Sequence, residues 1–186
     1  MPQIPPALIE GRNVRLRPLA ATDIEKSLIW RNDPAIRDAQ LGWPFPVTVQ
    51  MEETWYAEAL SGRRDRVSFA VEFQDAGLVG FVHLTGINWI SRTANFGITI
   101  GAKELQGRGA GKEATALLIA YAFDTLNLER VWLEVPAFNE RAIRLYEGIG
   151  FSHEGKLRGH AFCDGQRHDV LVMGLLRQEA LQKASF

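Results

Sequence analysis

The sequence predicts one α/β domain of the α+β type over residues 1–186, built on a single mixed, mostly antiparallel sheet of about seven strands flanked by four helices. Apolar residues recur with period two between residues 67 and 100, and with the helical period of about 3.6 after Gly111. No repeat, low-complexity tract or linker divides the chain. We therefore expect the element order β-α-α-β-β-β-α-β-α-β-β.

The first third combines one strand with two helices. Residues 13–19 alternate between apolar and basic side chains, which indicates a half-buried strand. Thr22 and Glu25 have the spacing of a capping box, which predicts a helix that begins there and runs through Trp30. A second helix is expected over residues 48–60.

The middle third changes to period two. Residues 67–73 and 78–87 are predicted to form a hairpin around the turn Asp75-Ala76-Gly77. Residues 94–100 then supply a third antiparallel strand. After Gly111 the apolar spacing becomes helical as far as Leu126.

The last third returns to the sheet twice. Residues 130–135 form a predicted strand, and Asn139 is a suitable N-cap for the helix after it. Gly150 can take the left-handed conformation that ends this helix. Two strands, residues 151–157 and 168–176, complete the fold.

The composition is that of an ordinary globular chain, 46% hydrophobic and 23% charged, with a formal net charge of −1. Such a balance lacks the positive charge with which proteins bind nucleic acid or anionic lipid, so neither is expected as a partner. The longest apolar run, residues 116–123, is far shorter than the roughly 20 residues that span a bilayer. A single cysteine, Cys163, and no leader pattern predict a cytoplasmic protein. No metal site is expected, because the histidines and the cysteine lack ligand spacing.

One glycine-rich segment lies between a predicted strand and a predicted long helix, and it reads Gln106, Gly107, Arg108, Gly109, Ala110, Gly111, Lys112. Three glycines in five positions suit a backbone that turns tightly and presents bare N–H groups to a ligand. The positive end of the following helix and two cations favour an anion there. A phosphate-bearing cofactor is the predicted occupant, and a simple strand-to-helix turn is the weaker alternative.

Two other phosphate motifs were compared with this loop. A Walker loop is excluded, because Gly111-Lys112 is not followed by Ser or Thr. The run from Gly109 to Ala114 fits a dinucleotide fingerprint, with Glu129 and Glu134 near the expected acidic position. Its context is wrong, because several residues separate Ile100 from Gly109 and three antiparallel strands precede it.

The segment Gln106–Gly111 resembles the Q/R-x-x-G-x-G/A pyrophosphate loop of the GNAT superfamily of acetyl-CoA-dependent N-acetyltransferases. Residues 139–151 are similar to that family's Asn-x-x-Ala-x-x-x-Tyr-x-x-x-Gly-Phe segment. Residues 14–19 and 164–173 resemble the RimJ/RimL-like branch, which holds ribosomal-protein N-terminal and spermidine acetyltransferases. The resemblance covers the whole chain and implies a GNAT fold with acetyl-CoA as acetyl donor.

The resemblance also implies roles for individual residues. The backbone of Ile98, Thr99 and Ile100 would pair with the pantetheine arm, and residues 106–112 would hold the pyrophosphate. Asn139, with Ala142 of the same motif, would contact the pantetheine or stabilise the loop. Tyr146 would direct its hydroxyl at the thioester sulfur, where a phenol can protonate the departing thiolate.

The proton acceptor and the amine site are less constrained. Many relatives carry glutamate near Asn95, and asparagine is not a useful base, so Glu72 and His83 are the candidates that could act directly or through water. Trp30 and Trp43 are the candidate walls of the acceptor pocket. The basic run of residues 63–66 has the pattern of a solvated loop.

The predicted activity is direct transfer of acetyl from acetyl-CoA to a primary amine in a ternary complex, the amine being a protein N-terminus, a polyamine or a small molecule. A non-catalytic acyl-CoA-binding module is the alternative, favoured by the absence of a glutamate near Asn95. A nicotinamide-dependent oxidoreductase is the weaker alternative. A homodimer is expected from the resemblance alone.

Overall fold

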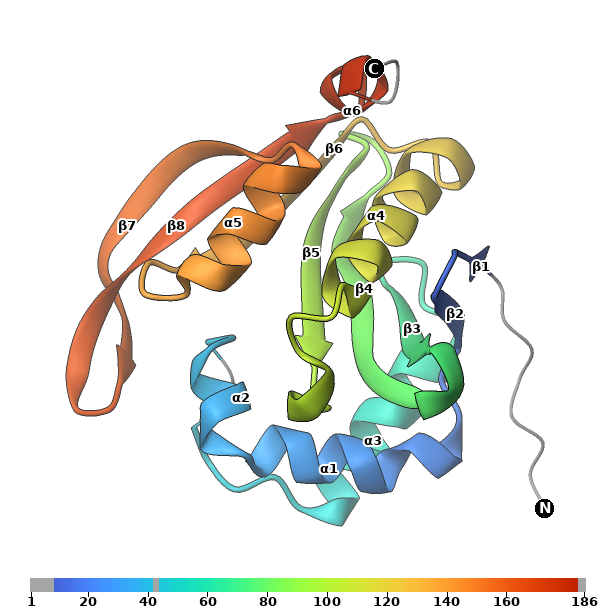
Figure 1. The fold of residues 1–186 in the computed structure, drawn as a ribbon, viewed down its shortest axis with the longest axis vertical. Helices are drawn as coiled ribbons and strands as arrows, with labels where there is room; N and C mark the ends of the chain where they lie inside the picture. Colours follow the sequence, from blue (N-terminus) through green and yellow to red (C-terminus); the bar gives the residue numbers. More distant parts are fainter. Residues whose placement is uncertain (1–8, 42–43, 184–186) are drawn as a thin grey trace.

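The computed structural model describes residues 9–41 and 44–183, whose strands form one sheet with helices on both faces (Figure 1). The strands are β1 (Ile9–Glu10), β2 (Val14–Pro18), β3 (Val67–Phe73), β4 (Leu78–Asn88), β5 (Thr93–Ile100), β6 (Arg130–Pro136), β7 (Ser152–Cys163) and β8 (Gln166–Leu176). The helices are α1 (Ile24–Asn32), α2 (Pro34–Asp38), α3 (Val49–Leu60), α4 (Ala110–Ala120), α5 (Glu140–Ile149) and α6 (Arg177–Lys183). The predicted fold class is confirmed, with eight strands in place of about seven and with α2 and α6 as additional helices.

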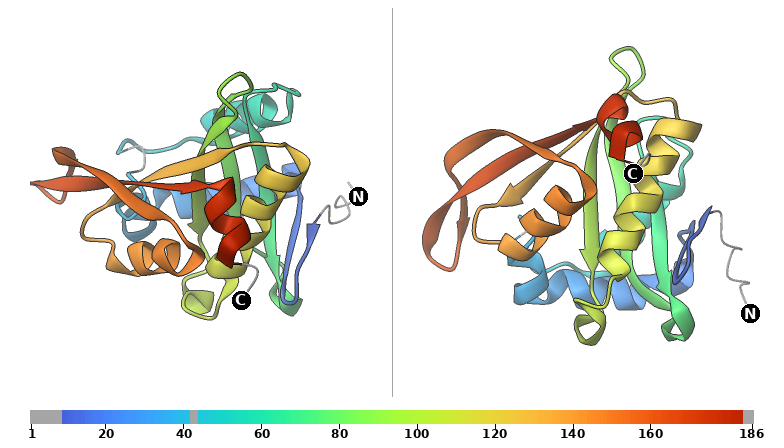
Figure 2. Two further views of the ribbon diagram at one scale, coloured as in Figure 1. Left: turned by 90° about the horizontal axis from the view of Figure 1, so that it is seen from above. Right: turned by 45° about the horizontal axis from the view of Figure 1, so that its top comes forward.

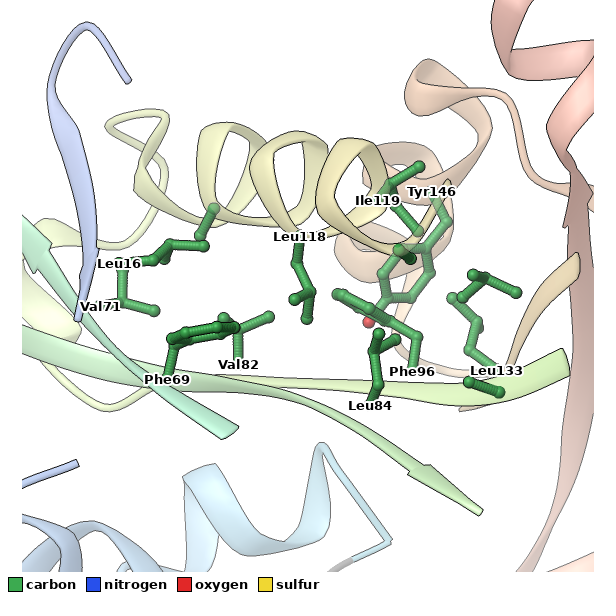
Figure 3. Close-up of a cluster of buried hydrophobic side chains, with 14 of the residues drawn as sticks. Leu16, Phe69, Val71, Val82, Leu84, Phe96, Leu118, Ile119, Leu133 and Tyr146 are labelled. Carbon is green, nitrogen blue, oxygen red and sulfur yellow. The ribbon is translucent and has the colours of Figure 1, made fainter. Parts of the chain in front are cut away.

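The sheet order is β1-β2-β3-β4-β5-β6-β8-β7, and every pair is antiparallel except β5 with β6. α4 and α5 cover one face, and α1 and α3 cover the other (Figure 1, Figure 2). Figure 3 shows Leu118 of α4 lying against strand residues Phe69, Val82 and Leu84, all of them buried. Burying one such leucine contributes about 1.5–3 kcal/mol, so this face holds the main core.

The parallel pair β5–β6 separates after three residues. Pairing covers Thr93 to Asn95 against Arg130 to Trp132, and then stops although both strands continue. β6 is paired along its whole length with β8, from Arg130 to Pro136, so it follows β8 and diverges from β5. The sheet is consequently open between the second halves of β5 and β6.

The predicted capping box at Thr22 is wrong. A short 3₁₀ turn, Ala21–Asp23, precedes α1, and the Asp23 carboxylate accepts a hydrogen bond from the Ala20 N–H at 2.8 Å. The same carboxylate binds Arg17 through two hydrogen bonds of 2.8 Å, and Arg17 is only 2% exposed. Asp23 therefore fixes the start of α1 because it is the partner that a buried arginine requires.

α2 is a one-and-a-half-turn helix that lies beside the opening in the sheet. Asp33 caps it by accepting a hydrogen bond from the Ala35 N–H at 3.0 Å. Just after it, the Ala39 carbonyl accepts a hydrogen bond from Asn139 Nδ2 at 2.9 Å, and Gln40 Oε1 accepts one from Thr99 Oγ1 at 2.7 Å. This segment is thereby fixed to both β5 and the start of α5.

The end of α4 and the last two strands also differ from expectation. The α-helix ends at Ala120 and continues as a π-helical turn, Tyr121–Thr125, instead of remaining regular to Leu126. β7 and β8 are longer than predicted and form an arm that projects from the body (Figure 2). In the described part of the chain, no helix has the length and apolar character needed to cross a membrane.

Candidate active site

A cleft of about 710 Å³ occupies the opening between β5 and β6. Its walls are the end of β5, the glycine-rich loop and the first turns of α5. The predicted site residues that line it are Ile98, Thr99, Ile100, Gln106, Gly107, Gly109, Gly111, Lys112, Asn139, Ala142 and Tyr146. Two predicted ligands do not line it, because Arg108 is exposed to solvent and Ala110 is buried in the core with 1% exposure.

The glycine-rich loop presents free backbone donors to the cleft. Gly107 and Gly109 have positive φ angles of 83° and 97°, so the turn does require glycine at these two positions. The first hydrogen bond of α4 runs from the Glu113 N–H to the Gly109 carbonyl at 3.0 Å, and the helix has no side-chain cap. The N–H groups of residues 109–112 therefore have no acceptor among the described residues. Together with the helix dipole, they form a site that suits a pyrophosphate.

Cations stand around this loop. Lys112, Arg141 and Arg144 line the cleft, and Arg141 Nη1 donates to Gln106 Oε1 at 2.9 Å. Gln106 Nε2 in turn donates to the Ile100 carbonyl at 2.8 Å, so the glutamine connects the loop to β5 and to α5. Arg141 was missed by the sequence analysis, although its place two residues after the N-cap Asn139, facing the loop, was a usable signal.

The Tyr146 side chain closes the inner end of the cleft. It is 8% exposed and packs edge-on against Phe96 of β5, with ring centroids 6.1 Å apart (Figure 3). Burial raises the pKa of its phenol to about 12, and its hydroxyl has no hydrogen-bond partner among the described residues. The group is protonated at neutral pH and free to donate a hydrogen bond into the cleft.

A second cavity of about 230 Å³ lies on the opposite face of the sheet, under α1, α2 and α3. Trp30, Trp55 and Phe81 form aromatic walls, and Trp30 packs edge-on against Phe81 at 5.7 Å between ring centroids. The two cavities share four lining residues, Ile36, Gln40, His83 and Thr99. Trp43, the other predicted wall of the acceptor pocket, lies outside the described residues.

His83 lies where the two cavities meet. Its imidazole covers Gly97 of β5 so closely that a Cβ atom on that glycine would overlap the ring. Burial, and then the nearby charge of Arg66, lower the pKa of His83 from 6.5 to about 4. The imidazole is therefore neutral at physiological pH.

Residues 13–152 match the family described as the acetyltransferase (GNAT) domain. The chain belongs to the GNAT acetyltransferase family. Spermidine N(1)-acetyltransferase of Escherichia coli K12 is 32% identical over 171 residues, which cover 92% of this chain and 90% of that protein. The Bacillus subtilis protein YdaF, whose name is that of a ribosomal N-acetyltransferase, is 37% identical over 105 residues, covering 56% of this chain and 57% of its own.

A solved structure agrees with the family assignment. The crystal structure of spermidine N-acetyltransferase from Vibrio cholerae in complex with CoA and spermine has a TM-score of 0.85 and 31% identity, and the match covers 91% of this chain and 98% of that one. This GNAT protein is an acetyl-CoA-dependent N-acetyltransferase that acts on an amine. The free N–H groups and cations of its loop fit the pyrophosphate of that donor, and the oxidoreductase and non-catalytic alternatives are set aside.

The candidate base Glu72 is not at this GNAT site. Its carboxylate accepts a hydrogen bond from Arg17 Nε at 2.9 Å and lies 3.6 Å from Arg15, and it lines neither cavity. Glu72 instead completes the ion pairs around buried Arg17, whose pKa is raised chiefly by the hydrogen bond to Asp23. The sequence does not show that Glu72 on β3 lies next to buried Arg17 on β2, because this contact depends on how the two strands pair.

Glu134 is the carboxylate that does line the GNAT cleft, together with Asn95. On β6, Leu133 and Val135 belong to the main core, so alternation along the strand turns Glu134 toward the other face, where His83 lies. Glu134 is exposed, and its carboxylate forms no hydrogen bond or ion pair with any described residue. The sequence analysis had considered this residue only as part of the rejected dinucleotide fingerprint.

Proposed function

We propose that the enzyme binds acetyl-CoA in the cleft between β5 and β6 and receives a small primary amine through the cavity on the opposite face. One observation carries the proposal, namely that the two cavities meet at His83 and Thr99, where the sheet is open. A donor from one face and an acceptor from the other would meet at this gap without competing for space. Transfer would then occur by direct attack in a ternary complex.

The cleft residues would position the donor. The N–H groups of residues 109–112, with Lys112 and Arg141, would hold the pyrophosphate. From Ile98 to Ile100, the edge of β5 that faces β6 is unpaired and would bind the pantetheine arm, and Asn139 would support the arm from the start of α5. Bound acetyl-CoA would supply a reactive thioester, so the chain need only align the reactants and move protons.

Two groups would carry those protons. Tyr146 would donate to the sulfur as the thiolate leaves, which its raised pKa of about 12 favours by keeping the phenol protonated. Glu134 would accept the proton of the amine, directly or through one water, because it is the carboxylate that lines the cleft. His83 is the weaker base, since burial and Arg66 both oppose its protonation.

The oligomeric state and the cellular location of the protein are proposed from the sequence. The family resemblance suggests a homodimer, which the molar mass in solution would test. The lone cysteine suggests a cytoplasmic location, which cell fractionation would test.

Thermal unfolding with and without ligands tests the donor site. At about 100 times its dissociation constant a ligand adds ~2.7 kcal/mol, which raises the midpoint of a protein of this size by roughly 5–10 °C. We expect this shift with acetyl-CoA and with CoA, no shift with NADPH, and thiol release when a primary amine is added. Lys112→Ala should reduce the shift, whereas Arg108→Ala, in the same loop but outside the cleft, should leave it unchanged. A shift without thiol release from any amine would contradict the proposed catalysis.

A further inference from the structure

The acceptor cavity is basic. Among the described residues that line it, three are arginines, Arg31, Arg37 and Arg66, and none is a carboxylate. A polyamine is a cation along its whole length and would meet the same sign of charge here. The lining therefore favours an acceptor with a different charge pattern.

Two of the three arginines are already neutralised. Arg31 Nη1 donates to Glu52 at 2.8 Å, and Glu52 is fully buried and also accepts a hydrogen bond from Ser27 Oγ at 2.5 Å. Arg37 Nε donates to Asp38 at 2.7 Å. These pairs shape the wall of the cavity and contribute little net charge to it.

Arg66 is different, because no described carboxylate forms an ion pair with it. Its Nε atom is buried and has no hydrogen-bond partner, and the guanidinium forms no ion pair among the described residues. Buried donors are nearly always paired in proteins, so an unpaired one in a cavity wall points to a missing acceptor. The charge of Arg66 helps to lower the pKa of His83, and it also acts on the neighbouring Asp65, whose carboxylate is hydrogen-bonded to Arg63 instead.

The position of Arg66 on the sheet aims it at this cavity. The residue directly precedes β3, and alternation places it on the same face as Ser68, while Val67 and Phe69 turn toward the main core. At the far side of His83, Glu134 supplies a negative charge to the neighbouring cleft. The path from acceptor cavity to reaction gap thus runs from an unpaired cation to an unpaired anion.

We propose that the acceptor is a small primary amine that also carries a carboxylate, as an amino acid does, and that Arg66 binds this carboxylate. The inference rests on the proposed function and adds the substrate class. A guanidinium binds a carboxylate through two parallel hydrogen bonds, which would satisfy the orphan Nε. The amine would then face the gap. Its nitrogen forms a bond to the acetyl carbon as the carbon–sulfur bond breaks, one amine proton goes to Glu134, and the thiolate receives a proton from Tyr146.

A matched acceptor panel tests the proposal. The natural amino acids are each compared with the corresponding amide, which keeps the amine but lacks the carboxylate, and spermidine serves as the polyamine. Thiol release at saturating acetyl-CoA gives kcat/KM for each acceptor. At least one amino acid should exceed both its amide and spermidine by about tenfold or more, the order expected for a hydrogen bond between charged groups.

Variants separate the roles of the charges. Arg66→Gln should remove the preference for the carboxylate by raising KM for the amino acid about tenfold, with the KM for acetyl-CoA unchanged, and Arg66→Lys should restore part of it. Arg63→Gln is the control, because Arg63 belongs to the same basic run but is exposed and pairs with Asp65 at 2.7 Å. Glu134→Gln should instead lower kcat.

The outcomes distinguish this inference from the proposed function. If acetyl-CoA stabilises the protein but spermidine or the amides are acetylated as well as the amino acids, the acceptor inference is overturned and the donor site stands. If acetyl-CoA gives no stabilisation, the proposed function itself has failed. The preference of the wild-type enzyme for amino acids over their amides tests the inference by itself. The test therefore remains valid even if Arg66→Gln fails to fold.

Discussion

The hydroxyl of Tyr146 provides the sharpest prediction about a single residue. Tyr146→Phe removes the proton donor but keeps the ring that packs on Phe96 at 6.1 Å. We expect kcat to fall about 100-fold, the usual order for loss of a general acid, with the Kd for acetyl-CoA unchanged. Steady-state kinetics and calorimetric titration measure the two quantities.

A matched variant checks that the hydroxyl itself is responsible. Tyr121 also packs edge-on against a core phenylalanine, Phe69, at 5.5 Å, but it lies outside the cleft. Tyr121→Phe should leave kcat within about twofold of wild type. An equal loss in both variants, or none in Tyr146→Phe, would exclude Tyr146 as the donor to the thiolate.

The sequence predicts residues whose role belongs to a local motif. It does not predict residues whose role depends on which distant segments the fold brings together. Tyr146 and the loop of residues 106–112 could be placed because the motif is contiguous. Arg66 was assigned to a solvated loop, which is correct for the exposed Arg63. Extending the alternation of the following strand by one residue would have turned Arg66 onto the face of Ser68, so a signal was present. For Glu134 there was no such signal, because its importance depends on where β6 leaves β5.

At the scale of elements, the turn into α4 allows a prediction in which two similar substitutions have opposite effects on stability. Gly109 has a φ of 97°, so Gly109→Ala should lower the free energy of unfolding by about 1–2 kcal/mol. Gly111 is helical, and a Cβ there would contact Leu145 and Ile100 at 3.4 and 3.5 Å, which is ordinary packing. Gly111→Ala should raise the free energy of unfolding by about 0.5–1 kcal/mol.

In Gly111→Ala, the affinity for acetyl-CoA and the stability of the protein should change in opposite directions. Gly111 lines the cleft, so its new methyl group would occupy space beside the pyrophosphate site and weaken acetyl-CoA binding although the protein is more stable. Urea denaturation and titration with acetyl-CoA measure the two effects separately. Equal destabilisation of the two variants would contradict the prediction, because it would mean that both positions require the backbone conformation of glycine.

Elements with a long, regular pattern were predicted well, and short elements fixed by tertiary contacts were not. The hairpin of β3 and β4, the helix expected over residues 48–60 (α3) and the N-cap of α5 at Asn139 all appear where they were expected. α2 has five residues, too few to show a helical period, and its place depends on Ala39 and Gln40 bonding to distant elements. β1 is a two-residue strand that exists only through its pairing with β2.

For the molecule as a whole, His83 makes stability depend on pH in a narrow window. Its pKa is about 4 in the folded state and 6.5 in the unfolded reference, so the unfolded chain binds the proton more tightly. Stability is therefore full above about pH 6.5 and decreases as the pH falls toward 4. The expected loss between pH 7 and pH 4.5 is ~2–3 kcal/mol.

Urea denaturation at several pH values measures this loss, with His83→Gln as the reference. The variant should lose little of its free energy of unfolding between pH 6.5 and 4.5, because it has no imidazole to protonate at this buried site. The carboxylates with lowered pKa values, such as Asp33 and Asp169 with an ordinary value of 3.8 and Glu154 with one of 4.5, lose their contribution as the pH falls through those values, and they do so equally in wild type and variant. Equal slopes for wild type and variant in this window would contradict the neutral, buried state of His83.

The separation of β5 from β6 has a consequence for how such enzymes diverge. The proposed donor and acceptor sites lie on opposite faces of one sheet and share four residues at the gap. Substitutions under α1 and α3 can therefore accumulate without disturbing the loop and strand edge on the donor side. A family of such enzymes can keep acetyl-CoA as its donor while the acceptor amine changes from one member to another. The relatives named for spermidine and for ribosomal substrates fit this pattern.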